Sequence, residues 1–288
     1  MAQHSASGPT HETAAEVTVA DFRAAAEHYW PARSAESWDR VGLVSGRDEA
    51  PLRRVLLAVD AVAATVDEAV AWDADALFTH HPLLLRGVHS VAEDTAKGAL
   101  LARLIRSDCA LLTAHTNADI PEGGVSAVIA ERLGLRSVRP IVENSIAGTD
   151  TPPGIGREGL LEAPESLRAF AERVARVLPP TVSGVRVAGD PERSVQRVAL
   201  LGGAGDSLLD HPLVRGADVY LTSDLRHHPA QESLELSAAV GGPALVDVAH
   251  WASESLWLEG AAARLEALLP GVEFRVSGIN TDPWTFSV

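Results

Sequence analysis

The chain has 288 residues, of which 46% are hydrophobic and 22% are charged. This length suits one large domain or two medium ones, and the composition is typical of a globular protein with a substantial core. The formal net charge of -15, with no basic run, argues against nucleic acid as a partner. Cys109 is the single cysteine, so the chain holds no disulfide framework, and we expect Cys109 to be a small buried apolar residue.

The beginning of the chain is polar and lacks an apolar centre. Residues 1–16 therefore predict a disordered tail and argue against a signal peptide. No apolar run reaches the length of a transmembrane helix, so we expect a cytoplasmic protein without a membrane partner. The first ordered element expected is a helix at about 19–30, which Thr18 can cap and Pro31 ends.

Strand and helix patterns alternate through the first half of the chain. Short aliphatic runs predict strands at 54–59, 76–79 and 109–113. Runs with an apolar stripe at helical spacing predict helices at 62–72, 97–107 and 125–133. This alternation predicts an α/β fold with largely parallel sheets flanked by helices.

The second half of the chain repeats the pattern of the first. A middle segment, residues 137–192, comes between them, with a helix expected at about 165–177 and a strand near 182–188. The strands at 55–58, 74–79 and 110–115 resemble, in the same order, residues 198–201, 217–222 and 244–250. We therefore predict two related α/β lobes from an internal duplication, at 17–136 and 193–288, with a ligand site between them.

Two adjacent histidines stand at the end of a predicted strand. His80 and His81 follow the apolar run 76–79, and Pro82 ends the strand because it has no N–H to donate. In open α/β sheets, ligands bind just outside the carboxyl ends of the strands. Successive side chains point to opposite sides, so these imidazoles can serve two neighbouring ions more easily than they can chelate one.

Two further pairs of residues share a four-residue spacing after matching strands. His250 and Glu254 lie on one face if a helix begins there, and His115 and Asp119 repeat the spacing in the first half. A single pair of this kind usually occurs by chance and is not a metal site. Because His80-His81 and the two spaced pairs all follow predicted strands, the three together favour a metal site. Mixed imidazole and carboxylate ligands suit Zn, Mn or Fe(II) better than Ca or Mg. The predicted ligands are His80, His81, Asp119, His250 and Glu254, with His115 as a spare.

Several motifs together resemble the GTP cyclohydrolase 1 type 2 homologue family, also called the Nif-three-like dinuclear-metal hexamers. They are Trp38-Asp39-Arg40-Val41-Gly42-Leu43, Thr79-His80-His81-Pro82-Leu83, His115-Thr116-Asn117-Ala118-Asp119, Gly202-Gly203-Ala204-Gly205, Leu221-Thr222-Ser223-Asp224 with His227-His228, and His250-Trp251-Ala252-Ser253-Glu254. These motifs lie within residues 18–288, which is nearly the whole chain. The sequence departs from the family at Arg40, where Asn is usual, and at Ala249, where Gly is usual. The middle segment is too short for the extra domain that some members carry.

The resemblance implies a two-metal site in which His80 and His81 each bind a different ion. Asp119 and His250 complete one ion each, and Glu254 bridges the two. The resemblance also implies a toroidal homo-hexamer with the metal sites facing its inner cavity.

Two functions fit such a site. The first is a metal-dependent hydrolase, for which the family name implies a purine nucleotide substrate, although a phosphate ester fits the same metals. His115 could shuttle the proton in that reaction if it does not itself bind metal. The alternative is a non-catalytic metal-binding ring that stores or delivers metal or acts as an interaction scaffold.

Four other features each allow two interpretations. The glycine run 202–205 could cradle a phosphate or form a tight strand-to-helix turn. His227 and His228 could shape the pocket, although a surface position is favoured. Asp60 could orient a metal-bound water or only support the site. The remaining aromatic candidates are core or oligomer contacts, namely Trp38, Trp251 and Trp284.

Overall fold

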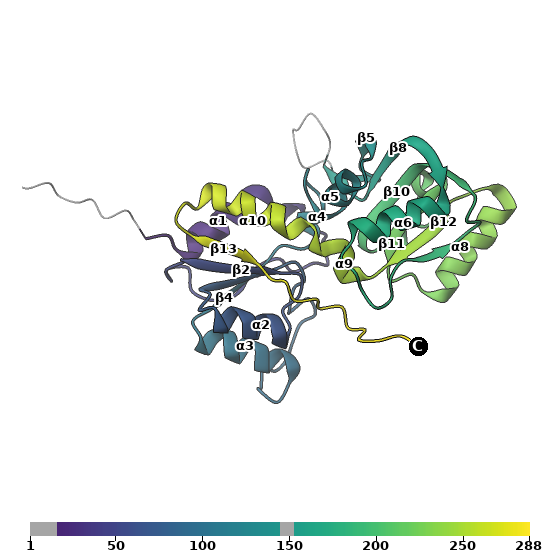
Figure 1. Ribbon diagram of the computed structural model, residues 1–288. Coiled ribbons are helices and arrows are strands. Elements are labelled where there is room, and N and C mark those ends of the chain that lie inside the picture. Colours follow the sequence, from purple (N-terminus) through teal and green to yellow (C-terminus); the bar gives the residue numbers. More distant parts are fainter. Residues whose placement is uncertain (1–15, 145–152) are drawn as a thin grey trace, which may run out of the picture.

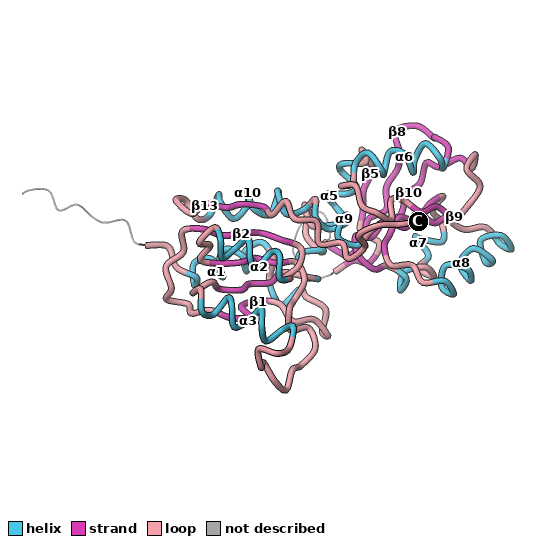
Figure 2. Tube along the Cα trace, turned by 60° about the horizontal axis from the view of Figure 1, so that its bottom comes forward, coloured by secondary structure: helices cyan, strands magenta, loops and turns pink. Residues whose placement is uncertain are grey.

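The computed structural model describes residues 16–144 and 153–288 (Figure 1). The predicted disordered tail therefore lies outside the described residues, except for Glu16. In the described part of the chain, no helix is both long and apolar enough to cross a membrane. Figure 2 shows the strands gathered into two separate groups, with α9 (His250–Ser255) between them.

The first sheet has the strand order β1-β4-β3-β2-β13, and its strands run parallel except for β1. Their bounds are β1 Gly42–Ser45, β2 Arg54–Ala58, β3 Ala76–Thr79, β4 Ala110–Thr113 and β13 Glu273–Val276. One face is covered by α1 (Val19–Tyr29) and α10 (Trp257–Leu268), and the other by α2 (Ala63–Ala71) and α3 (Ala96–Arg106) (Figure 1). The alternation of apolar side chains along β2 explains this arrangement, because successive residues face opposite layers.

The second sheet is mixed, with the strand order β5-β8-β10-β11-β12-β9. Its strands are β5 Arg136–Arg139, β8 Arg157–Ser166, β9 Arg186–Ala188, β10 Ser194–Ala204, β11 Val219–Ser223 and β12 Ala244–Val248. The apolar side chains of α5 (Val125–Arg132) and α6 (Leu167–Val177) join the core on one face, and those of α7 (Pro212–Arg215) and α8 (His227–Val240) join the core on the other. The short elements are the helices α4 Thr116–Asp119, η1 Ala32–Ser34 and η2 Asp206–Leu208, and the paired strands β6 Val142–Glu143 and β7 Gly154–Ile155.

The predicted α/β class, with sheets flanked by helices, is confirmed. The expectation of largely parallel strands holds for the first sheet and for the centre of the second, β10-β11-β12. It is wrong for the edges of the second sheet, because β5, β8 and β9 pair antiparallel. Residue composition does not predict β8, since this strand has no Val, Ile, Thr or aromatic residue and contains Gly159 and Pro164.

The two lobes correspond in detail. Val55 pairs with Ala76 between β2 and β3, and the residues at the matching positions, Val198 and Val219, pair between β10 and β11. The carboxylate of Asp75 accepts hydrogen bonds from two successive backbone N–H groups of the neighbouring chain, at residues 53 and 54. A second aspartate, at the matching position 218, does the same at residues 196 and 197. This correspondence is consistent with the predicted duplication.

Each sheet also recruits strands from beyond the lobe boundaries expected from the sequence. The late strand β13 lies in the first sheet, beside β2. The middle segment supplies β8 and β9, which lie in the second sheet. One apolar core cluster contains residues of both sheets, including Phe78 and Val246. Whether residues 17–136, 137–192 and 193–288 behave as separate units stays a prediction.

A buried glutamate gives the fold a testable pH dependence. Glu158 on β8 is 4% exposed and accepts hydrogen bonds from Arg139, at 2.7 Å, and from Arg197. Burial would raise the pKa of Glu158, but the two guanidinium groups outweigh it and lower this pKa below its ordinary value. The resulting stabilisation is fully present above the unfolded-state pKa of about 4.3 and is lost as the pH falls through the folded-state pKa.

We therefore expect Glu158→Gln to lower the free energy of unfolding at pH 7 by about 1–3 kcal/mol, as for other hydrogen bonds to charged groups. The difference from the wild type should shrink at pH 3, as measured by urea denaturation. Glu162→Gln is the matched control, because Glu162 pairs with Arg136 on the surface. An unchanged free energy of unfolding in Glu158→Gln at pH 7 would contradict this view of the ion pair.

Candidate metal centre

The centre is built around the end of β3. Hydrogen bonding between β2 and β3 continues past the last residue of β3, since the N–H groups of His80 and His81 donate to the carbonyls of Ala58 and Val59, at 3.2 and 2.8 Å. This fixes the backbone of both histidines. Their rings leave the strand in different directions, so that His80 is fully buried while the His81 side chain remains 26% exposed.

Two short helices supply the other predicted ligands. α4 follows β4 directly and brings Asp119, with His115 at its N-terminal boundary. α9 follows β12 directly and brings His250 and Glu254. The predicted ligands therefore come from the carboxyl ends of strands in both sheets, as the sequence analysis expected for a site between the two lobes.

Glu254 lies at the middle of the predicted ligands. Its Oε1 atom lies 3.5 Å from Nε2 of His80 and 2.9 Å from Nε2 of His250, and its Oε2 atom lies 2.9 Å from Nε2 of His81. Asp119 Oδ1 lies 3.8 Å from Nε2 of His80. The structure thus brings all five predicted ligands together. His115 lies beside them, with its ring centroid 5.1 Å from that of His80.

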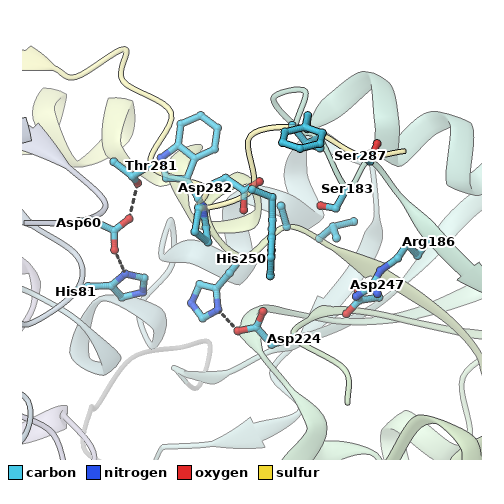
Figure 3. A pocket seen from close by; sticks show the side chains of 17 residues that line it. Asp60, His81, Ser183, Arg186, Asp224, Asp247, His250, Thr281, Asp282 and Ser287 are labelled. Atoms are coloured by element: carbon cyan, nitrogen blue, oxygen red, sulfur yellow. Dashed lines mark hydrogen bonds and ion pairs between the residues drawn. The ribbon is translucent and has the colours of Figure 1, made fainter. Parts of the chain in front are cut away.

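Every imidazole in the cluster is held from behind through its Nδ1 atom. The partners are the carbonyl of Ala114 for His80 at 3.0 Å, Asp60 for His81 at 2.7 Å, Asp39 for His115 at 2.9 Å and Asp224 for His250 at 2.7 Å. Figure 3 shows the Asp60 and Asp224 contacts. A carbonyl or carboxylate only accepts, so the proton of each neutral ring lies on Nδ1 and the Nε2 lone pair faces the cluster.

When the rings are neutral, as metal ligands must be, this arrangement leaves acceptors facing acceptors. Nε2 of His80 and Oε2 of Glu254 are buried and have no hydrogen-bond partner among residues 16–144 and 153–288. A divalent cation would satisfy both atoms, so these residues fit a metal ion. Two groups, His80 with His81 and His115, and His81 with His250 and Glu254, each offer ligand atoms within 4.8 Å of one another. Either group could hold a metal ion.

Burial and the charges of neighbouring side chains shift the pKa values of the cluster residues. Burial lowers the pKa of His80 and so keeps this ring neutral. Burial opposes the charge of His81 and His250, but Glu254 outweighs it and raises the pKa of His81 to about 10 and that of His250 to about 11. Without a bound ion these two rings are therefore cationic, and with His80 they hold the pKa of Glu254 well below the usual range, although burial opposes its ionisation. Burial, and then the charge of Glu254, raise the pKa of Asp119 well above its ordinary value. Positive charge between Glu254 and Asp119 would therefore allow both carboxylates to be ionised at the same time.

The glycine run forms a wall of the centre. β10 continues through Gly202 and Gly203, whose N–H groups donate to the hydroxyls of Ser126 and Ser253 at 3.1 and 2.9 Å. These donors are thus unavailable to a phosphate, which disfavours the phosphate-cradle interpretation. A Cβ atom at Gly203, where φ is +78°, would lie 2.5 Å from Glu254 Oε1. Glycine is required there by the close approach of the Glu254 carboxylate.

The structure also shows where the residues lie whose roles had two possible interpretations from the sequence. Asp60 holds His81 by a direct hydrogen bond and so supports a predicted ligand. His227 and His228 are exposed at the start of α8 and are not part of the cluster. Trp38 is 54% exposed and its ring edge meets His115, with centroids 5.9 Å apart. Trp251 is half-buried and packs against the main core, whereas Trp284 is exposed.

Sequence reasoning missed the roles of Asp39 and Asp224. Both residues lie in motifs that carry the family resemblance. An acidic residue close to a strand end was the feature that could have indicated their roles. Asp224 directly follows β11 and has φ of 57°, a conformation that Asp tolerates better than most residues. The departure at Ala249 is accommodated, because its φ of -64° suits any residue at the start of α9.

A cavity of about 560 Å³ opens onto the centre (Figure 3). It is lined by His81 and His250 of the cluster, by Arg186 of β9 and Trp251 of α9, and by residues 281–284, 286 and 287. Two of the predicted ligands are therefore within reach of a molecule that enters the cavity.

Comparison with known proteins identifies the family to which the chain belongs. The profile of Duf34/NIF3 (NGG1p interacting factor 3) matches residues 17–283. The chain belongs to this family. A Streptomyces coelicolor protein named "GTP cyclohydrolase 1 type 2 homolog" is 49% identical over 263 residues, covering 90% of both chains. A Mycobacterium leprae protein of the same name is 36% identical and covers 92% of this chain and 94% of its own.

Solved structures share the fold of this Duf34/NIF3 protein. A Bacillus cereus protein related to NIF3 superposes with a TM-score of 0.86 at 23% identity, over 95% of this chain and 100% of that chain. A Staphylococcus aureus protein superposes with a TM-score of 0.82 at 26% identity, over 94% and 99% of the two chains. The overall fold is therefore shared with these two solved structures.

The tight contact at Gly203 yields a test of the cluster. Gly203→Ala should displace the Glu254 carboxylate and reduce the metal content of the purified protein, as measured by elemental analysis. Gly134→Ala is the matched control, because Gly134 has φ of +74° but open space around its Cβ position. Both variants should lose about 1–2 kcal/mol of stability through backbone strain, but only Gly203→Ala should lose metal. Full metal content in a folded Gly203→Ala variant would contradict the close contact between residue 203 and the Glu254 carboxylate.

Proposed function

We propose that this protein is a metal-dependent hydrolase with a dinuclear centre. One ion would be held by His80, Asp119 and Glu254, and the other by His81, His250 and Glu254. The observation that carries this proposal is the set of inward-facing Nε2 atoms around a buried carboxylate, with His80 Nε2 and Glu254 Oε2 lacking a hydrogen-bond partner in the described structure. The donor set suits Zn, Mn or Fe(II).

The position of the centre supports catalysis over a purely structural role. Bound ions would supply a water of lowered pKa and would polarise the group under attack. The cavity beside His81 and His250 gives a substrate access to the site. A structural metal site is normally closed by protein ligands, whereas this one opens to a cavity of ligand size.

His115 is proposed to move the proton. Asp39 accepts from its Nδ1, and the second oxygen of Asp39 is bound by the N–H and hydroxyl of Thr116. This leaves Nε2 of His115 free to take or give a proton beside the cluster. His115 also lies close enough to His80 and His81 to be a ligand, as the sequence analysis allowed.

The substrate is proposed from the relatives' names and the metals. Because the relatives are named as homologues of a GTP cyclohydrolase, a purine nucleotide is the first candidate, and a phosphate ester is the second. We also propose a toroidal homo-hexamer and a cytoplasmic location, on the family resemblance and the composition alone.

Metal content tests the ligand set. We expect about two ions per chain in the wild type by elemental analysis, as in other two-metal hydrolases, and a loss of about one ion in His250→Ala. His228→Ala is the matched control, since His228 is an exposed histidine outside the cluster. An undiminished ratio in His250→Ala would count against the site.

Turnover tests the hydrolase. Metal-loaded protein is incubated with a panel of nucleoside triphosphates and phosphodiesters, and ring opening or phosphate release is measured. His115→Ala should lower kcat by about 10²–10⁴ with metal content retained, as expected for loss of a general acid–base group. Loss of metal in this variant would instead make His115 a ligand. A panel without turnover would favour the non-catalytic ring for metal storage, delivery or scaffolding.

A further inference from the structure

The residues after β13 cross from the first lobe to the cavity beside the metal centre. We call residues 277–288 the crossing segment, which is the yellow coil that leaves β13 in Figure 1. It is tied to the first lobe by the N–H of Ser277, which donates to the carbonyl of Leu57 at 2.8 Å. Further on, its residues Thr281, Asp282 and Trp284 line the cavity together with residues of the second lobe.

Thr281 reaches the metal centre through one intermediate side chain. Its hydroxyl donates to Oδ2 of Asp60, while Oδ1 of the same carboxylate accepts from Nδ1 of His81 at 2.7 Å (Figure 3). The opposite nitrogen of His81 lies 2.9 Å from Glu254. A continuous line of contacts thus joins the crossing segment to the central carboxylate.

The same arrangement occurs a second time in the cluster. Asp39 accepts from Nδ1 of His115 with one oxygen, and its other oxygen accepts from the N–H and hydroxyl of Thr116 at 3.0 and 2.5 Å. In both cases a threonine hydroxyl fixes a carboxylate that fixes an imidazole. Thr116 is adjacent to His115 in the chain, whereas Thr281 lies 221 residues from Asp60.

His81 needs this support more than His80 does. The partner of His80 is the carbonyl of Ala114, which the main chain holds in place. The partner of His81 is a side chain that is 25% exposed and can rotate toward water. A second hydrogen bond from Thr281 removes that freedom, so Asp60 keeps His81 aimed at the cluster.

We propose that Thr281 is a positioning residue of the metal centre, and that the crossing segment is therefore part of the site and not only a wall of the cavity. This inference rests on the proposed dinuclear centre. It predicts that removal of the hydroxyl weakens binding of the ion held by His81, although Thr281 itself touches no metal.

The test compares Thr281→Val, which keeps the shape and loses the hydroxyl, with Thr281→Ser, which keeps the hydroxyl. Each Zn-loaded protein is dialysed against graded EDTA, and the metal-to-chain ratio is measured. We expect Thr281→Val to release one ion at about tenfold lower EDTA than the wild type, the usual effect of losing an outer-shell partner. Thr281→Ser should restore retention, and Thr285→Val, an exposed position in the same segment, should match the wild type.

A double-mutant comparison shows whether Thr281 acts through Asp60. Asp60→Ala and the double variant Asp60→Ala/Thr281→Val should lose the ion at the same EDTA concentration, because the hydroxyl has no carboxylate left to fix. Release of the ion from the double variant at a further tenfold lower EDTA concentration would show that Thr281 does not act through Asp60, and would overturn the proposal. The melting temperatures of the metal-free proteins, compared in the same buffer, separate loss of metal binding from loss of fold.

The outcomes distinguish this proposal from the one on which it rests. A wild-type protein that binds about two ions, with Thr281→Val retaining both as well as the wild type does, would overturn the role of Thr281 and leave the dinuclear centre standing. A wild-type protein that binds no divalent metal would overturn both.

Discussion

The structure depends on one buried carboxylate and the imidazoles turned toward it. Glu254 is 4% exposed and lies within 3.5 Å of the Nε2 atoms of His80, His81 and His250. An ionised carboxylate in such a place is unfavourable unless it is paired with positive charge, which protonated His81 and His250 supply when no ion is bound. When the rings are neutral and hold their protons on Nδ1, this charge is missing. The proposed cations would supply the missing positive charge. This requirement explains why the ends of strands from two separate sheets are held together at one point.

The fold holds these groups on rigid elements. Hydrogen bonding between β2 and β3 extends to both adjacent histidines, and the other predicted ligands lie on helices that begin directly after strands. Behind His80, the rings of Phe78, Trp30 and Trp257 pack together, with the Trp257 centroid 5.4 Å from that of His80. A metal site on such elements keeps its geometry without the ion, which favours selective binding.

A second layer of carboxylates surrounds the first. Asp39, Asp60 and Asp224 each accept a hydrogen bond from Nδ1 of an imidazole, which fixes the ring and strengthens Nε2 as a metal ligand. Three of the acidic residues that give the chain its negative charge therefore support imidazoles of the cluster. The three carboxylates differ in how they are held. Asp39 is fixed by Thr116, the neighbour of His115 in the chain, and Asp60 is fixed by Thr281 of the crossing segment. Asp224 lines the cavity.

The sequence by itself determined the strand at 76–79, the α/β class and the five predicted ligands, because local periodicity and residue spacing carry that information. The tertiary structure decided how those pieces are joined. It alone brought β13 beside β2, placed β8 and β9 in the second sheet, and paired Asp60 with Thr281. It also showed that Gly203 is required by contact with Glu254 and not by a phosphate. These contacts join residues far apart in the chain, and no local pattern of side chains specifies which distant segment will pack against which.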